Sequence, residues 1–173
     1  GSEHEVLIAQ EHSAEDDLAL ITELARLFAD RRYVRVAGKP LLVVYRVDIL
    51  PDAAATAERW RARCRELGVG EIFLVAAQSF GIDDPLPFGF DAAVEFPPHG
   101  AQAVNAITST IEVLNPSFAG HILSFDAFAD LYKRVCRPPA YPLFRTVCPS
   151  WDNSARVLER GRVVLDGSPA VVF

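Results

Sequence analysis

Two almost continuous apolar runs constrain the fold of this chain more than any other feature of the sequence. The first run is Leu41–Tyr45 and the second is Ile72–Ala77. A strand with one face in water alternates apolar and polar residues, whereas an uninterrupted apolar strand suits burial on both faces. Such strands are typical of parallel sheets that are covered by helices, so we expect a parallel sheet in this chain.

Helical patterns lie before the first run and between the two runs. Ser13 is suited to cap a helix, and acidic residues at positions 15–17 follow in its first turn, where the helix dipole favours negative charge. Apolar residues then recur at helical spacing, at Leu18, Ile21, Leu24, Ala25 and Phe28. A second helix is expected from about Pro51 to Gly68, where the glycine favours termination.

Further strands are expected at residues 5–10, 91–96, 141–147 and 162–165, and a helix is expected after Ser124. Alternating strands and helices indicate parallel strands joined by right-handed crossovers. A complete eight-stranded barrel of this kind needs about 250 residues, and the chain has 173. We therefore expect an α/β fold, either an open doubly wound sheet or a partial (β/α)8 TIM-type barrel. In a barrel, residues 1–173 would form a single domain, an internal portion of the larger barrel, whose exposed sheet edges allow self-association.

Composition excludes several classes of protein. The formal net charge is −6 and no long basic cluster occurs, which argues against a nucleic-acid partner. No apolar run approaches the roughly 20 residues that a membrane-spanning helix needs. The cysteines Cys64, Cys136 and Cys148 are odd in number and widely spaced, so neither a disulfide framework nor a zinc site is indicated. Cysteines without disulfides fit a reducing compartment, so a cytoplasmic location is expected. No glycine-rich phosphate loop follows a strand, and no cofactor is expected.

Two acidic residues lie on one face of the strand expected at 91–96. Strand alternation places Asp91 and Glu95 on the same side, about 13 Å apart at roughly 3.3 Å per residue. That separation exceeds the roughly 5–10 Å of catalytic carboxylate pairs, so each needs a partner from elsewhere. Glu95 ends the strand and is a candidate ligand-binding group. The alternative is a structural role, in which Glu95 caps a loop or pairs with an arginine such as Arg46 or Arg145.

Polar and aromatic residues at other strand ends complete the candidate site. Tyr45 and Gln78 end their strands, and two prolines stiffen the loop that presents His99. In the segment 151–153 an indole stands beside a carboxylate and an amide, a combination that suits sugars. The alternative for this segment is a helix start, with Asp152 or Ser150 as the cap and Trp151 in the core. The candidate substrate-binding residues are Tyr45, Gln78, Asp91, Glu95, His99, Trp151, Asp152 and Asn153.

Five ordered blocks, at residues 7–12, 38–46, 89–98, 141–145 and 149–153, carry a resemblance to a known family. The chain resembles the WbsX family, often labelled glycosyltransferase WbsX, which is similar to the glycoside hydrolase family 99 group of (β/α)8 barrels. The resemblance implies the partial (β/α)8 barrel rather than the open sheet. It also implies a carbohydrate-active domain that acts on glycosidic bonds in bacterial surface polysaccharide, O-antigen or capsule. Its partner would be an oligosaccharide or polysaccharide.

The resemblance also implies which residues lie near the sugar. Carried over by position, these residues are Asp91, Glu95, Trp151, Asp152 and Asn153, with Glu95 and Asp152 as the catalytic candidates. The family's downstream block, where the acid and base of its hydrolase relatives reside, does not occur in this sequence. We therefore expect this piece to lack the main catalytic carboxylates. Two functions stay open, part of an enzyme or a non-catalytic glycan-binding or scaffold module.

Overall fold

The chain divides into two compact units, Gly1–Ala93 and Val94–Phe173. The computed structural model describes residues 12–99, 104, 106–134 and 138–165. The strand expected at residues 5–10 lies outside the described residues. Each unit has its own hydrophobic core.

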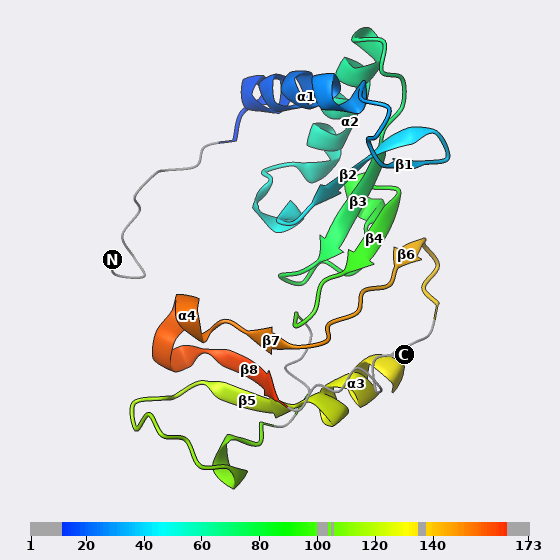
Figure 1. The fold of residues 1–173 in the computed structure, drawn as a ribbon. Helices are drawn as coiled ribbons and strands as arrows, with labels where there is room; N and C mark the ends of the chain where they lie inside the picture. The colour runs from blue at the N-terminus through cyan, green and yellow to red at the C-terminus, as the bar shows by residue number, and fades with distance from the viewer. Residues whose placement is uncertain (1–11, 100–103, 105, 135–137, 166–173) are drawn as a thin grey trace. The chain divides into compact units, whose positions relative to one another are not determined.

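The first unit contains three strands and the start of a fourth, which are neighbours in the order β1-β2-β3-β4, and β4 continues into the second unit. The strands are β1 (Arg35–Val36), β2 (Lys39–Val44), β3 (Phe73–Gln78) and β4 (Ala92–Glu95) (Figure 1). Strands β2 and β3 run parallel, with Leu41 opposite Phe73. They correspond to the two apolar runs, so the expected parallel pairing is confirmed for these strands.

Strand β1 corrects the expectation that all strands are parallel, because it pairs with β2 in antiparallel orientation. The two strands are joined by Ala37 and Gly38, whose φ angles are 48° and 80°. Two consecutive residues with positive φ form the tight turn that closes a β-hairpin. The segment before Gly38 looks like a polar connection in the sequence, and the hairpin within it is too short to show periodicity.

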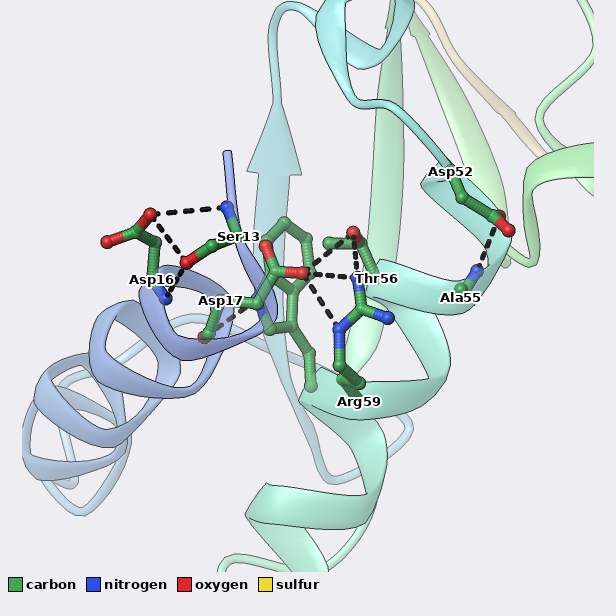
Figure 2. A network of polar contacts seen from close by, with 8 residues as sticks. Ser13, Asp16, Asp17, Asp52, Ala55, Thr56 and Arg59 are labelled. Atoms are coloured by element: carbon green, nitrogen blue, oxygen red, sulfur yellow. Dashed lines mark hydrogen bonds and ion pairs between the residues drawn. The ribbon is translucent and has the colours of Figure 1, made fainter. Parts of the chain in front are cut away.

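Two helices, α1 (Ala14–Phe28) and α2 (Ala53–Glu66), pack against each other in this unit. Helix α1 begins at the expected cap: the Ser13 hydroxyl accepts from the Asp16 backbone N–H at 3.1 Å, and the Asp16 carboxylate accepts from the Ser13 backbone N–H at 3.2 Å (Figure 2). Helix α2 is capped by Asp52, whose carboxylate accepts from the Ala55 N–H at 2.9 Å. Both predicted helices are confirmed within a few residues of their expected bounds.

A buried carboxylate joins the two helices. Asp17 in α1 is only 6% exposed. Its Oδ2 accepts from the Thr56 hydroxyl at 2.9 Å and from Arg59 Nη2 at 2.6 Å, both in α2 (Figure 2). The Trp60 indole N–H donates to the Asp17 backbone carbonyl at 3.1 Å. Around this network lies the core, which includes Ile21, Phe28, Ala57, Cys64, Ile72 and Leu74.

The second unit contains a smaller sheet with strand order β5-β8-β7. These strands are β5 (His121–Ser124), β7 (Trp151–Asp152) and β8 (Arg162–Leu165), with helix α3 (Phe125–Arg134) following β5. Its core consists of Val104, Leu123, Phe125, Phe128 and Val164. The helix after Ser124 and the strand at 162–165 are confirmed, whereas β5 is a strand that the sequence pattern does not predict.

Strand β7 is the second correction to the all-parallel expectation. Strands β5 and β8 are parallel, but β7 and β8 are antiparallel. Only the segment 153–161, with the short helix α4 (Ser154–Val157), connects β7 to β8. A parallel crossover needs a dozen or more residues, so this connection returns the chain antiparallel. The fold is therefore mixed α/β rather than an all-parallel sheet.

The strand expected at 141–147 is reduced to the two residues of β6 (Leu143–Phe144). Pro142 directly precedes β6 and has no backbone N–H to donate to a neighbouring strand. The residues after β6 make side-chain contacts with Glu95, described below, instead of continuing the strand.

Candidate functional site

Polar and aromatic side chains gather where β2 and β3 end in the first unit. Because the two strands are parallel, their carboxyl ends lie at one edge of the sheet, the usual position of ligand sites in such sheets. The Ser79 hydroxyl after β3 donates to the Tyr45 carbonyl after β2 at 2.7 Å. The rings of Tyr45 and Phe80 meet edge to face, with centroids 5.8 Å apart. We call Tyr45, Arg46, Ser79 and Phe80 the strand-end cluster.

A cation completes the strand-end cluster. The guanidinium carbon of Arg46 lies 3.9 Å from the centroid of the Phe80 ring, a cation–π contact. Arg46 also donates to both carboxylate oxygens of Asp48, at 2.7 and 2.8 Å. Hydrogen bonding to this guanidinium lowers the pKa of Asp48 from its ordinary value. The arrangement fixes the guanidinium over the ring.

The structure brings the predicted residues Tyr45 and Gln78 to the same sheet edge. The Gln78 side chain donates to the Asp83 carbonyl at 3.3 Å. The sequence prediction missed Phe80, and it considered Arg46 both as a residue at the strand end that could line the site and as a possible partner of Glu95. The available signal was position, since each residue lies two positions after the last residue of a buried strand, Val44 or Gln78.

Asp91 precedes β4 at the opposite end from Glu95 and is tied to its own unit. Its Oδ2 accepts from the Leu74 backbone N–H at 2.7 Å and from Arg61 Nη2 at 2.9 Å. Arg61 in turn donates to the Ile72 carbonyl at 2.8 Å. These contacts hold the start of β4 against β3 and α2, and the sugar contact expected of Asp91 stays a prediction.

Glu95 ends β4 and lies in the second unit. Its carboxylate forms an ion pair with Arg145 and accepts from the Thr146 backbone N–H at 3.0 Å. The Thr146 hydroxyl also donates to the Glu95 backbone carbonyl, at 2.7 Å. The side chain of Glu95 is 12% exposed. The ion pair with Arg145 that the sequence left open is confirmed, and it fixes the direction of the carboxylate.

His99 is held through its backbone. The Tyr132 hydroxyl from α3 donates to the His99 carbonyl at 2.6 Å, and the His99 ring lies 5.8 Å from the ring of Phe96. Burial, and then the negative charge of ionised Cys148 and Glu95, raise the pKa of Tyr132 to about 12. The phenol therefore stays neutral and acts as a hydrogen-bond donor throughout the physiological pH range.

The segment 151–153 forms strand β7 and the cap of α4. Trp151 packs against the core of the second unit, and its buried indole N–H has no hydrogen-bond partner among the described residues. Asp152 accepts from the Ser154 backbone N–H at 2.8 Å, and hydrogen bonds from Ser154 lower the pKa of Asp152. Asn153 occupies the cap position of α4 and accepts from the Arg162 N–H at 2.6 Å. The helix cap thus lies one residue after Asp152 and three after Ser150, the two expected caps, whereas the expected packing of Trp151 against the core is confirmed.

Comparison with known proteins decides the family. The family described as Glycosyltransferase WbsX matches residues 1–172. The chain belongs to the WbsX family. Two relatives, both called "Uncharacterized protein WxcX" and from two strains of Xanthomonas campestris pv. campestris, are 45% and 44% identical over 170 residues. Those residues cover 98% of this chain and 24% of each relative, so the chain spans about a quarter of their length.

A solved structure supports the fold of this WbsX-family chain. It is described as a "Glycoside hydrolase-like protein" and is similar with a TM-score of 0.51 at 13% sequence identity. The similarity covers 92% of this chain and 44% of that chain. At this level of identity the likeness concerns the fold alone, an α/β arrangement shared with that protein.

The described part of the chain contains no group of three or more histidine, cysteine, aspartate or glutamate side chains placed to hold a metal ion. None of its helices has the length and apolar character that crossing a membrane requires. The candidate residues are thus distributed over the two units: the strand-end cluster belongs to the first, and Glu95, His99 and the segment 151–153 belong to the second.

Proposed function

We propose that this WbsX-family chain is part of a protein that acts on glycosidic bonds in bacterial surface polysaccharide, such as O-antigen or capsule. The observation that carries the proposal is the family match over residues 1–172. The fold it shares with a glycoside hydrolase-like protein supports the same direction. A sugar ligand accounts for both kinds of side chain at the strand ends: aromatic rings suit the apolar faces of sugar rings, and carboxylates accept hydrogen bonds from sugar hydroxyls.

We also propose that the complete protein closes into a (β/α)8 barrel to which the first unit contributes β2, α2 and β3. The parallel pairing of β2 with β3 around an intervening helix supports this assignment. In such barrels the chemistry lies at the carboxyl ends of the strands, which is where the strand-end cluster is found. A structure of the full-length protein tests the proposal, and an open sheet without closure would contradict it.

Glu95 and Asp152 are proposed as the polar groups that meet the sugar. The pairing of Glu95 with Arg145 and Thr146 fixes the orientation of its carboxylate, and a fixed carboxylate is suited to orient a hydroxyl or to stabilise a cationic transition state. Asp152 is exposed, and its lowered pKa keeps it ionised at neutral pH. An ionised Asp152 accepts hydrogen bonds from sugar hydroxyls but does not serve as a general acid.

A second function, a glycan-binding or scaffold module without catalysis, is favoured by one observation. The carboxylates of Asp91 and Glu95 are each engaged by an arginine, Arg61 and Arg145 respectively. In both cases the carboxylate oxygens are engaged by contacts within the protein, as in structural ion pairs. Under this alternative the sugar binds the full-length protein but leaves it unchanged.

One experiment separates the two functions. Purified full-length protein is incubated with mannose-containing and O-antigen oligosaccharides, and the masses of the products are measured by mass spectrometry. Loss or gain of a hexose or deoxyhexose mass shows that a glycosidic bond is broken or formed. Binding without any change of mass supports the glycan-binding module instead.

Two further expectations are carried forward as proposals. Exposed sheet edges allow pairing with a second copy of the chain, and light scattering of the purified protein at several concentrations measures this association. Fractionation of the native host tests the expected cytoplasmic location by showing in which compartment the full-length protein is recovered.

A further inference from the structure

We propose that Phe80 forms a stacking surface for the apolar face of a neutral pyranose ring, and that Tyr45 and Arg46 are positioning residues for the Phe80 ring. The inference rests on the proposed function and deepens it, because it names one sugar-contacting position and the chemical class of its occupant. It concerns only the first unit, whose strand-end cluster contains all three side chains.

The geometry holds the ring of Phe80 without burying it. Tyr45 contacts it edge to face at an interplanar angle of 68°, and Arg46 lies over it at 3.9 Å. Phe80 nevertheless stays 50% exposed and Tyr45 43% exposed. A large aromatic side chain that is both fixed and exposed loses little conformational freedom when a ligand covers it, which favours binding.

The charges around the ring favour a neutral sugar over an acidic one. Arg46 is the cation of the cluster, and Asp48 engages it through two hydrogen bonds. The guanidinium therefore has its charge balanced within the protein and is used to fix the ring. The ligand contact that remains is apolar, and it suits the C–H groups on one face of a pyranose.

The backbone of Phe80 is a second, independent observation. Its φ angle is 50°, in the left-handed region that bulky side chains rarely adopt. Glycine or asparagine satisfies this conformation at lower cost. Burial does not account for phenylalanine here, since half of the residue is exposed. Residues held in such conformations cluster at ligand sites, and the position of Phe80 beyond the carboxyl end of β3 agrees with that role.

Saturation-transfer NMR on the full-length protein tests the proposal. The probes are the methyl pyranosides of glucose, galactose and mannose, and saturation is applied to the aromatic protons of the protein. Phe80→Asn removes the ring but keeps a residue that tolerates the left-handed backbone, and Phe80→Tyr keeps the ring. We expect the affinity for at least one probe to fall about tenfold in Phe80→Asn. In Phe80→Tyr the affinity is expected to stay near the wild-type value. The Tm of Phe80→Asn is expected not to fall.

Two results overturn the proposal: wild-type binding in Phe80→Asn, or no transfer to any of the three probes in the wild-type protein. The outcome is separable from that of the proposed function. Ring-dependent binding in a protein that never changes the mass of an oligosaccharide supports the stacking surface and rejects the catalytic function. Turnover together with unchanged binding in Phe80→Asn rejects the stacking surface alone.

Discussion

The guanidinium of Arg145 forms an ion pair with the carboxylate of Glu95, which lies 50 positions earlier in the chain. The next residue, Thr146, adds two hydrogen bonds to Glu95, one from its backbone N–H and one from its hydroxyl. The carboxyl end of β4 and the segment after β6 are thus joined through one acidic residue. This connection both stabilises the second unit and fixes the proposed sugar-contacting carboxylate.

Arg145→Ala is expected to lower the free energy of unfolding by about 1 kcal/mol, because it leaves the poorly exposed Glu95 carboxylate without its cation. Urea denaturation followed by far-UV circular dichroism measures the change. Arg26→Ala is the matched control, since Arg26 pairs with Glu23 on the exposed surface of α1 and the change there is expected to be small. Equal effects of the two variants would contradict the structural role of Arg145.

Asp17→Asn is expected to destabilise the first unit by about 2 kcal/mol. The amide keeps the volume of the side chain but removes the negative charge that Arg59 requires in a nearly buried position. Asp30→Asn is the control, because Asp30 pairs with Arg32 at the surface, and its unfolding midpoint is expected to stay at the wild-type value. Thermal unfolding of the two variants under identical conditions makes the comparison, and an unchanged midpoint in Asp17→Asn would show that the network carries no stability.

Tyr132 gives a prediction at alkaline pH. Its pKa is raised mainly by burial from the ordinary 10.0 to about 12. Stability from this raised pKa is fully present below pH 10 and is lost as the pH rises through about 12, because the unfolded chain releases its proton first. Tyr132→Phe should therefore lose less stability than wild type between pH 10 and 12 in urea titrations.

The difference in tyrosinate absorbance between wild type and Tyr132→Phe reports the ionisation of Tyr132 directly. Its midpoint is expected near pH 12, and Glu95→Gln is expected to lower that midpoint because it removes a nearby negative charge. A midpoint near pH 10 would show that the phenol is open to solvent.

The local signals in the sequence predict a large part of the first unit. Ser13 caps the first helix as expected, and the runs at 41–45 and 72–77 become neighbouring parallel strands. These elements are determined by hydrogen bonds and apolar contacts close in sequence or by burial on both faces, which leaves a periodic pattern. The hairpin β1–β2 depends on the backbone of Ala37 and Gly38, which has no such periodicity.

The second unit and the site were harder to predict because their determinants are distant in sequence. The pairing of β5 with β8 joins residues about forty positions apart. Both strands are short, and their sequences do not indicate with which strand each of them pairs. The sequence offered Arg46 and Arg145 equally as partners of Glu95, and only the fold selects Arg145. The sequence reveals neither the positive φ angle of Phe80 nor the exposure of half of this residue.

The initial rate of sugar release or transfer by the full-length protein carrying Glu95→Gln tests the central claim most directly. Glu71→Gln is the matched control, since Glu71 also pairs with an arginine, Arg65, but precedes β3 instead of ending a strand. We predict that kcat/KM falls by about 100-fold or more in Glu95→Gln, while Glu71→Gln keeps the wild-type rate. A wild-type rate in Glu95→Gln would contradict the claim that Glu95 contacts the sugar during the reaction.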